Sequence, residues 1–195
     1  QVKVITMEEI SKKVIDYLMK ELIEDFDSVI LLGVGGLRFF NFFRNLSIFK
    51  NKRIIELKWS RSWDGDNASF FETNIDKFNI RNERIIIFED VIASGETILN
   101  INSFLKKNNN KIISIITCLM QETSPMYCNS FCNTIVGNVI NKSTSTELDP
   151  FWYPPIYSLR HLLYGDIEMS KFYKNLNERY FNNEKSVEKL IKEMR

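Results

Sequence analysis

The residues best suited to chemistry lie in one segment near the middle of the chain, Arg84–Thr97, with the sequence RIIIFEDVIASGET. Its apolar first half predicts a buried strand that delivers two adjacent acids, Glu89 and Asp90, to its carboxyl end. The next turn supplies consecutive backbone N–H groups and the hydroxyls of Ser94 and Thr97 where a helix begins. Amides and hydroxyls at a helix start suit a phosphate monoester, whereas carboxylates suit the vicinal hydroxyls of a sugar and a nearby magnesium ion. Together these residues predict a site for a phosphorylated ribose.

The elements that must position this site alternate along the chain. Apolar residues recur every three and four positions in two stretches, which predicts helices over Met7–Glu24 and Ser94–Lys107. Two charged stretches late in the sequence predict further helices over Ile167–Tyr180 and Glu184–Met194. Short apolar runs predict strands, and these are Ser28–Leu32, Arg53–Leu57, Arg84–Phe88, Lys111–Leu119 and Asn133–Ile140. This alternation predicts an α/β fold, a mostly parallel twisted sheet flanked by helices, with ligands at the carboxyl ends of the strands.

Composition narrows the class of protein and its partners. A chain of 195 residues, 44% of them apolar, suits one compact α/β domain. Lys and Arg total 26 against 25 Asp and Glu, so no broad positive field exists and nucleic acid is an unlikely partner. The apolar runs are far shorter than a membrane span, so no membrane partner is expected. The cysteines Cys118, Cys128 and Cys132 form no even disulfide framework, which favours reduced thiols and a cytoplasmic location.

The segment Arg84–Thr97 resembles the phosphoribosyl diphosphate signature of the type I phosphoribosyltransferases: four apolar residues, two acids, two apolar residues and then small-Ser/Thr-Gly-x-Thr. The resemblance implies a single phosphoribosyltransferase domain over residues 1–195, with the type I fold and a small aromatic hood. It also implies that Glu89 and Asp90 are catalytic: they hold the ribose 2- and 3-hydroxyls and contact the metal indirectly or through those hydroxyls. The residues that it assigns to substrate binding here are Val91, Ile92, Ala93, Ser94, Gly95, Glu96 and Thr97. The alternative interpretation is a buried strand, a capped helix and a solvated acid pair.

A glycine-rich turn, Gly33-Val34-Gly35-Gly36, is predicted to join the first strand to a helix. It is similar in place and type to the family's pyrophosphate loop, where backbone amides face the leaving group. Family members with a Ser-Arg-Gly-Gly-Leu loop carry an arginine where this chain has Val34, so the resemblance implies that one contact to pyrophosphate is lost. Arg38 either replaces that contact or is a surface residue of the following helix.

Lys58–Asn79 is predicted to be a long loop, and such a loop inside a compact domain is usually functional. It corresponds to the mobile catalytic loop of the resembled family, which closes over the substrates and excludes water. The resemblance implies that Lys58 and Arg61 neutralise the departing pyrophosphate. The alternative is that both are solvated charges, and that Trp59 and Trp63 simply pack under the loop.

Aromatic residues and prolines crowd the irregular segment Leu148–Tyr157. It resembles the hood of purine-type members, where a ring stacks on the nucleobase, which assigns Phe151, Trp152 and Tyr153 to substrate binding. The resemblance builds the hood from the N-terminal helix and from about residues 143–165. The alternative is a packed aromatic corner.

Position 93 and the hood give conflicting indications of which nucleobase would accept the phosphoribosyl group. Members that use 6-oxopurines often carry an Asp where this chain has Ala93, which cannot exchange a proton with the purine ring. That pattern is typical of adenine, orotate and uracil members, whereas the hood favours xanthine and guanine members. His161, the single histidine, is interpreted as structural.

These observations favour an enzyme of purine or other nucleobase salvage that transfers the 5-phosphoribosyl group from phosphoribosyl diphosphate to a nucleobase nitrogen. The resemblance further implies Mg²⁺ as cofactor and a homodimer. A second hypothesis keeps the fold but makes the protein a non-catalytic regulator that binds a nucleotide. A third is a Rossmann-type cofactor domain on Gly33, Gly35 and Gly36, with Glu56 placed for a ribose, although Arg38 stands where that fingerprint has its last glycine.

Overall fold

The computed structural model describes residues 7–64, 68–92, 95–121, 132–140, 182 and 185–193. The strands are β1 (Ser28–Leu32), β2 (Arg53–Leu57), β3 (Trp59–Asp64), β4 (Ala68–Thr73), β5 (Arg84–Ile92), β6 (Lys111–Gln121) and β7 (Asn133–Ile140). The helices are α1 (Met7–Asp16), α2 (Gly33–Asn41), α3 (Glu96–Lys106) and a helix over residues 185–193. Shorter turns are the π-helical η1 (Tyr17–Glu21) and the 3-10 turns η2 (Ser47–Phe49) and η3 (Ile75–Phe78). Within the described residues, no helix is long and apolar enough to cross a membrane.

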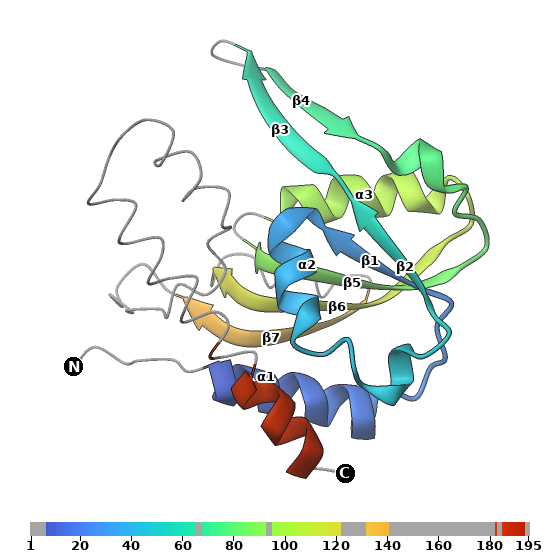
Figure 1. The fold of residues 1–195 in the computed structure, drawn as a ribbon. Helices are drawn as coiled ribbons and strands as arrows, with labels where there is room; N and C mark the ends of the chain where they lie inside the picture. Colours follow the sequence, from blue (N-terminus) through green and yellow to red (C-terminus); the bar gives the residue numbers. More distant parts are fainter. Residues whose placement is uncertain are drawn as a thin grey trace, which may run out of the picture.

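Five of the strands form one parallel sheet in the order β2-β1-β5-β6-β7. The chain crosses through α2 between β1 and β2, and through α3 between β5 and β6, as Figure 1 shows. Within the described residues, strands β3 and β4 pair only with each other, antiparallel, and make a ribbon that extends beyond the sheet (Figure 1). The predicted parallel sheet flanked by helices is therefore confirmed.

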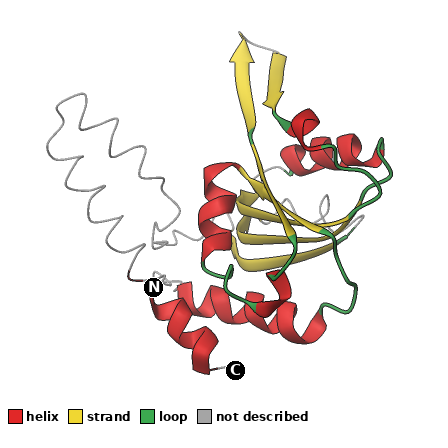
Figure 2. Cartoon of the chain, turned by 45° about the vertical axis from the view of Figure 1, so that its right-hand side comes forward, coloured by secondary structure: helices red, strands yellow, loops and turns green. Residues whose placement is uncertain are grey.

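Helices cover both faces of the sheet, which Figure 2 shows from a second direction. On one face, α1, α2 and the helix over 185–193 share a core with alternate residues of β1 and β5. Phe88 lies at the centre of an aromatic cluster there, and its ring centroid is 5.1–6.0 Å from those of Phe39, Phe40, Phe43 and Phe49. On the other face, α3 packs Ile98, Ile101 and Leu105 into a second core with the intervening strand residues. Continuous apolar strands are expected in a sheet that is buried on both faces.

The structure corrects three of the predicted elements. The strand predicted to end at Phe88 continues to Ile92, because Glu89 and Val91 still pair with β6. The glycine turn is wrong as a separate loop, since α2 begins at Gly33 directly after β1, with a positive φ of 58° at that residue. The loop predicted over Lys58–Asn79 is also wrong as an irregular segment, because it holds β3, β4 and η3.

The other predicted elements agree with the structure where it describes them. The first helix continues into η1, α3 covers most of its predicted range, and β7 has the predicted bounds. A helix over 185–193 occupies the last predicted helical stretch and adds Val187 and Ile191 to the core that contains α1. The helix predicted over Ile167–Tyr180 lies outside the described residues.

Candidate active site

The candidate site lies where β1 and β5 end side by side. Leu31 of β1 pairs with Phe88 of β5, so that Gly33, Glu89 and Asp90 follow at the same edge of the sheet. After β1 the chain crosses to one side of this strand pair, and after β5 it crosses to the other side. In open parallel sheets, ligands bind in the crevice where the crossover direction changes. The acids that the sequence singles out are therefore at the position where this topology places a ligand.

The two acids form a closely coupled pair. The backbone N–H of Asp90 donates to Glu89 Oε1 at 3.1 Å, and the N–H of Val91 donates to Asp90 Oδ1 at 2.9 Å. Glu89 is partly buried. Burial, together with the hydrogen bond and the charge of Asp90, raises the pKa of Glu89 well above its ordinary value. Within the described residues no lysine or arginine forms an ion pair with either carboxylate, so the pair is suited to a cationic or hydroxyl-bearing ligand.

Two glycines bring the first turn of α2 into direct contact with β5. A β-carbon at Gly36 would lie 2.4 Å from the carbonyl oxygen of Phe88, and one at Gly35 would lie 2.2 Å from Cγ of Asp90. Both separations are far below van der Waals contact, so neither position has room for a side chain in this arrangement. The start of α2 thus forms one wall of the candidate site.

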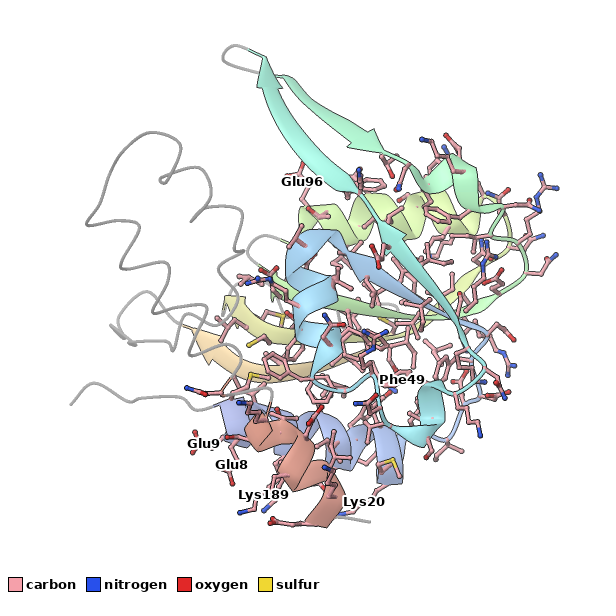
Figure 3. The ribbon with its side chains drawn as sticks, viewed as in Figure 1. Glu8, Glu9, Lys20, Phe49, Glu96 and Lys189 are labelled. Carbon is pink, nitrogen blue, oxygen red and sulfur yellow. The ribbon has the colours of Figure 1, made fainter. Side chains whose placement is uncertain are left out.

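The start of α3 lies beyond the carboxyl end of β5. Gly95 precedes the helix with a positive φ of 78°, and Figure 3 shows Glu96 at the N-terminal end of α3. Neither Leu32 before α2 nor Gly95 before α3 has a side chain that could accept a hydrogen bond, and no capping side chain is seen at either helix. First-turn N–H groups have no partner within their own helix, so both helix starts are suited to an anion.

Thr117 of β6, which sequence reasoning missed, supports the acid pair from behind. Thr117 is fully buried, and its hydroxyl lies 3.3 Å from the carbonyl oxygen of Asp90 and 3.0 Å from that of Leu119. Cys118 is buried as well, and burial, with a smaller contribution from the charge of Asp90, raises the pKa of its thiol well above the ordinary value. A threonine inside an otherwise apolar strand was the signal that could have identified this support.

Comparison with known proteins rests on structure alone, since no protein-family model and no curated sequence matches the chain. A purine phosphoribosyltransferase from Pyrococcus horikoshii has a TM-score of 0.50 at 14% identity, over 73% of this chain and 93% of that one. A hypothetical protein from Neisseria gonorrhoeae with bound ppGpp has a TM-score of 0.57 at 15% identity, over 92% and 98%. The AQ2163 protein from Aquifex aeolicus has a TM-score of 0.52 at 10% identity, over 72% and 76%.

The chain has the type I phosphoribosyltransferase fold.

Within this phosphoribosyltransferase fold, the predicted site residues of the sheet and of the helix starts come together. Asp90 lies against Gly35 in the first turn of α2, and α3, which carries Thr97 in its first turn, begins four residues after the end of β5. The side chains of Val91 and Ile92 pack toward the two cores, so only their backbone groups remain for a ligand. Arg38 is half-buried near the end of α2.

The remaining predicted site residues are placed less completely. Lys58 is exposed between β2 and the ribbon, and its backbone N–H donates to Asn74 Oδ1 at 2.8 Å. Arg61 pairs with Phe71 in the ribbon, and the direction of its side chain is not described. Trp59 is half-buried against the core that contains α3. Other predicted residues lie outside the described part of the chain, and these are Ala93, Ser94, Phe151, Trp152, Tyr153 and His161.

Proposed function

We propose that this protein is a phosphoribosyltransferase that moves the 5-phosphoribosyl group from phosphoribosyl diphosphate to a nucleobase nitrogen and releases pyrophosphate. The observation that carries the proposal is the acid pair Glu89 and Asp90. It lies at the ligand-binding edge of a phosphoribosyltransferase fold, and no ion pair compensates it within the described residues. Carboxylates in such a place suit the vicinal hydroxyls of a ribose, which donate hydrogen bonds to them.

The two helix starts supply complementary sites for phosphate. The first turn of α3, with Gly95 and Thr97, is proposed to hold the 5-phosphate, and the first turn of α2, with Gly35, is proposed to face the pyrophosphate. The reaction develops positive charge on the sugar and negative charge on the leaving group. Preorganised amides and the acid pair stabilise both without reorganising during the reaction. The base nitrogen forms its bond to the anomeric carbon as the bond to pyrophosphate breaks, and no covalent enzyme intermediate is required.

Magnesium fits the residues at this site. Mg²⁺ is usually held by one or two carboxylates together with waters and substrate phosphates, and Glu89 and Asp90 provide such a donor set. A cation also favours the ionised form of Glu89, which burial disfavours. When bound, the ion would neutralise charge on the leaving pyrophosphate. Glu89 and Asp90 would hold it indirectly or through the substrate hydroxyls.

The ribbon and the hood are proposed to complete the site. Lys58 and Arg61 would bring positive charge to the pyrophosphate from the base and the first strand of the ribbon. Phe151, Trp152 and Tyr153 would stack on the nucleobase. Both assignments come from the resemblance of the sequence to the family.

The proposal is tested by incubating the protein with Mg²⁺, phosphoribosyl diphosphate and, in turn, adenine, guanine, hypoxanthine, xanthine, uracil and orotate. Pyrophosphate release is followed together with formation of the nucleoside monophosphate, which identifies the acceptor. Release that depends on one of the bases supports the transferase. A protein that binds ribose 5-phosphate but releases no pyrophosphate with any of the six bases would argue against a nucleobase transferase.

A second candidate function is a regulator that binds a nucleotide without catalysis. The observation that favours it is the Neisseria gonorrhoeae protein with bound ppGpp, which aligns over 92% of this chain. Calorimetric titration with ppGpp, alone and in the presence of phosphoribosyl diphosphate, separates the two candidates when it is combined with the turnover assay. Tight binding of ppGpp without turnover on any base would favour the regulator.

The location and assembly of the protein are proposals as well. Cys118 is a buried free thiol, which suits the reducing cytoplasm. The homodimer that the family resemblance implies is tested by sedimentation equilibrium over a range of protein concentrations.

A further inference from the structure

The tightest contact in the candidate site joins Gly35 of α2 to Asp90 of β5. A β-carbon at Gly35 would lie 2.2 Å from both Cγ and Oδ2 of Asp90, and 2.6 Å from Oδ1. The Asp90 carboxylate therefore occupies the space into which any side chain at this position would point. Its Oδ1 also accepts the hydrogen bond from the backbone N–H of Val91 at 2.9 Å. Asp90 is thus held between α2 and its own strand, and the lack of a side chain at Gly35 makes that placement possible.

Gly36, the next residue, has a different structural role from Gly35. A β-carbon there would collide with the backbone of Phe88, at 2.4 Å from its carbonyl oxygen and 3.2 Å from its carbonyl carbon. Backbone in the central strand cannot move without disturbing the sheet, whereas the Asp90 side chain can turn about its Cα–Cβ bond. Substitution of Gly36 should therefore strain the fold, while substitution of Gly35 should leave the fold in place and displace the Asp90 carboxylate.

We propose that Gly35 is a positioning residue of the transferase site that acts through Asp90, by leaving room for its carboxylate against the first turn of α2. The inference rests on the proposed function and adds to it. The resemblance gives Gly35 a backbone amide that faces pyrophosphate, and an alanine at this position would keep that amide. Loss of activity on substitution with alanine therefore reports the placement of Asp90 and not the loss of a phosphate contact.

A double-mutant cycle tests this role in the full chain. The native protein, Gly35→Ala, Asp90→Ala and the double variant are compared in pyrophosphate release and in the dissociation constant of ribose 5-phosphate with Mg²⁺. Gly35→Ala should lower kcat about 10²-fold in the native background, because small displacements of a catalytic group cost about that much. In the Asp90→Ala background the carboxylate is gone, so the same change should alter kcat and the dissociation constant by less than about twofold.

Gly137→Ala provides a matched control. A β-carbon at Gly137 would lie 2.5 Å from the carbonyl oxygen of Cys118 and 2.5 Å from Cγ2 of Ile10 in α1, so it strains the contacts of β7 with β6 and α1 and meets neither Gly35 nor Asp90. It should lower the unfolding temperature while turnover per folded molecule, measured well below that temperature, stays unchanged. Gly35→Ala should show the opposite pattern, with a small change in unfolding temperature and a large loss of turnover.

The possible outcomes separate the inference from the proposed function. Equal effects of Gly35→Ala in both backgrounds, or a Gly35→Ala protein as active as the native one, would overturn the positioning role while leaving the transferase intact. Native protein that neither releases pyrophosphate nor binds ribose 5-phosphate would overturn the proposed function. In that event the unfolding temperatures of the same four proteins still test whether Gly35 and Asp90 interact. A non-additive effect of the two substitutions supports the contact, and an additive effect argues against it.

Discussion

Acids lie at both ends of the parallel strands, but only those at the amino edge have ion-pair partners within the described residues. At the amino edge, Asp25 and Asp27 are matched by Lys52 Nζ at 2.7 Å and by Arg84 Nε at 3.4 Å. Nearby, Lys111 pairs with Glu24 at 3.0 Å and Arg53 with Glu83 at 2.9 Å. Hydrogen bonds from Lys52 and from the Arg84 backbone are the chief causes that lower the pKa values of Asp25 and Asp27.

At the carboxyl edge the described residues provide no such partner, and the pKa of Glu89 is raised, chiefly by burial. Acids compensated by ion pairs stabilise the fold, whereas acids left uncompensated in a partly buried place cost stability and mark a candidate functional site. The contrast singles out the carboxyl edge as the candidate functional edge, which the nearly neutral charge of the whole chain does not do.

The largest difference between the edges should appear when one acid from each is neutralised. Under the proposed function, Asp90→Asn should lower pyrophosphate release by about 10²–10³-fold, because it removes a charge that would stabilise the reacting sugar and its metal. The fold should persist, since an amide oxygen can still accept the hydrogen bond from Val91. Asp27→Asn is the matched control and should leave turnover unchanged. Steady-state rates and circular-dichroism melts of both variants test this prediction. An Asp90→Asn protein with native turnover would show that Asp90 has no catalytic role.

The close contact between α2 and β5 at the carboxyl edge should be sensitive to a larger side chain. Gly36→Ala should reduce the free energy of unfolding by about 1–3 kcal/mol, as overpacking against fixed neighbours usually does. The physical cause is the 2.4 Å approach of the new methyl group to the Phe88 carbonyl oxygen. Urea unfolding measures the effect. A variant as stable as the native protein would mean that α2 can move away from β5 at little cost.

The pH dependence of stability should differ in sign between the two edges. The folded-state pKa of Glu89 is raised, so the folded protein binds the Glu89 proton more tightly than the unfolded chain does. Its contribution to stability is fully present below the unfolded pKa and is lost as the pH rises through the folded pKa. Glu89→Gln should therefore gain stability over the native protein as the pH rises from about 4 toward neutrality. The measurement is urea unfolding at several pH values without ligand, and a difference that is constant with pH would contradict the prediction.

Removal of the Thr117 hydroxyl, which supports the acid pair from β6, should have a smaller effect on stability. Thr117→Val keeps the shape of the side chain and removes the hydroxyl near the carbonyl oxygens of Asp90 and Leu119. The expected loss is about 1 kcal/mol of unfolding free energy, the usual contribution of one hydrogen bond. Chemical denaturation with a parallel measurement of kcat tests it. A large loss of turnover without loss of stability would instead make Thr117 part of the catalytic machinery.

Disruption of one ion pair at the amino edge should have the smallest effect. Asp27→Asn should cost about 1 kcal/mol or less near neutral pH, because the pair with Arg84 is exposed to solvent. The pKa of Asp27 is lowered, so its contribution is present above the unfolded pKa and is lost as the pH falls through the folded pKa. The difference between the native and variant proteins should therefore shrink in acid. Thermal melts at pH 7 and in acid provide the comparison.

Sequence reasoning located the sheet and the strand end that carries the candidate site because the signals there are local. The apolar run before Glu89 predicted a buried strand, and Asn133–Ile140 was predicted with the bounds that the structure has. The prediction ended β5 at Phe88 because two acids usually end an apolar strand. In this chain they continue it, since Glu89 pairs with Thr117 in the neighbouring strand.

Other features required the three-dimensional structure or a neglected pattern. The contact between Gly35 and Asp90 joins residues from different elements, and no local pattern reports it. The ribbon is a different case, because residues 65–67 (Gly-Asp-Asn) form a turn signal between two short runs that was not interpreted as a hairpin. Both runs are short and mix polar with aromatic residues, which is why their composition suggested a loop.

The way the ribbon joins the sheet has a consequence for the evolution and engineering of this fold. Its base is closed by the hydrogen bond from the Lys58 N–H to Asn74 Oδ1 at 2.8 Å and by the pairing of Trp59 with Thr73. Whatever lies beyond this closure can be lengthened, shortened or exchanged for the hairpin of another protein without shifting the register of the parent strands. The chain thus carries a graft point next to its candidate site, where the ribbon can be exchanged while the scaffold remains unchanged.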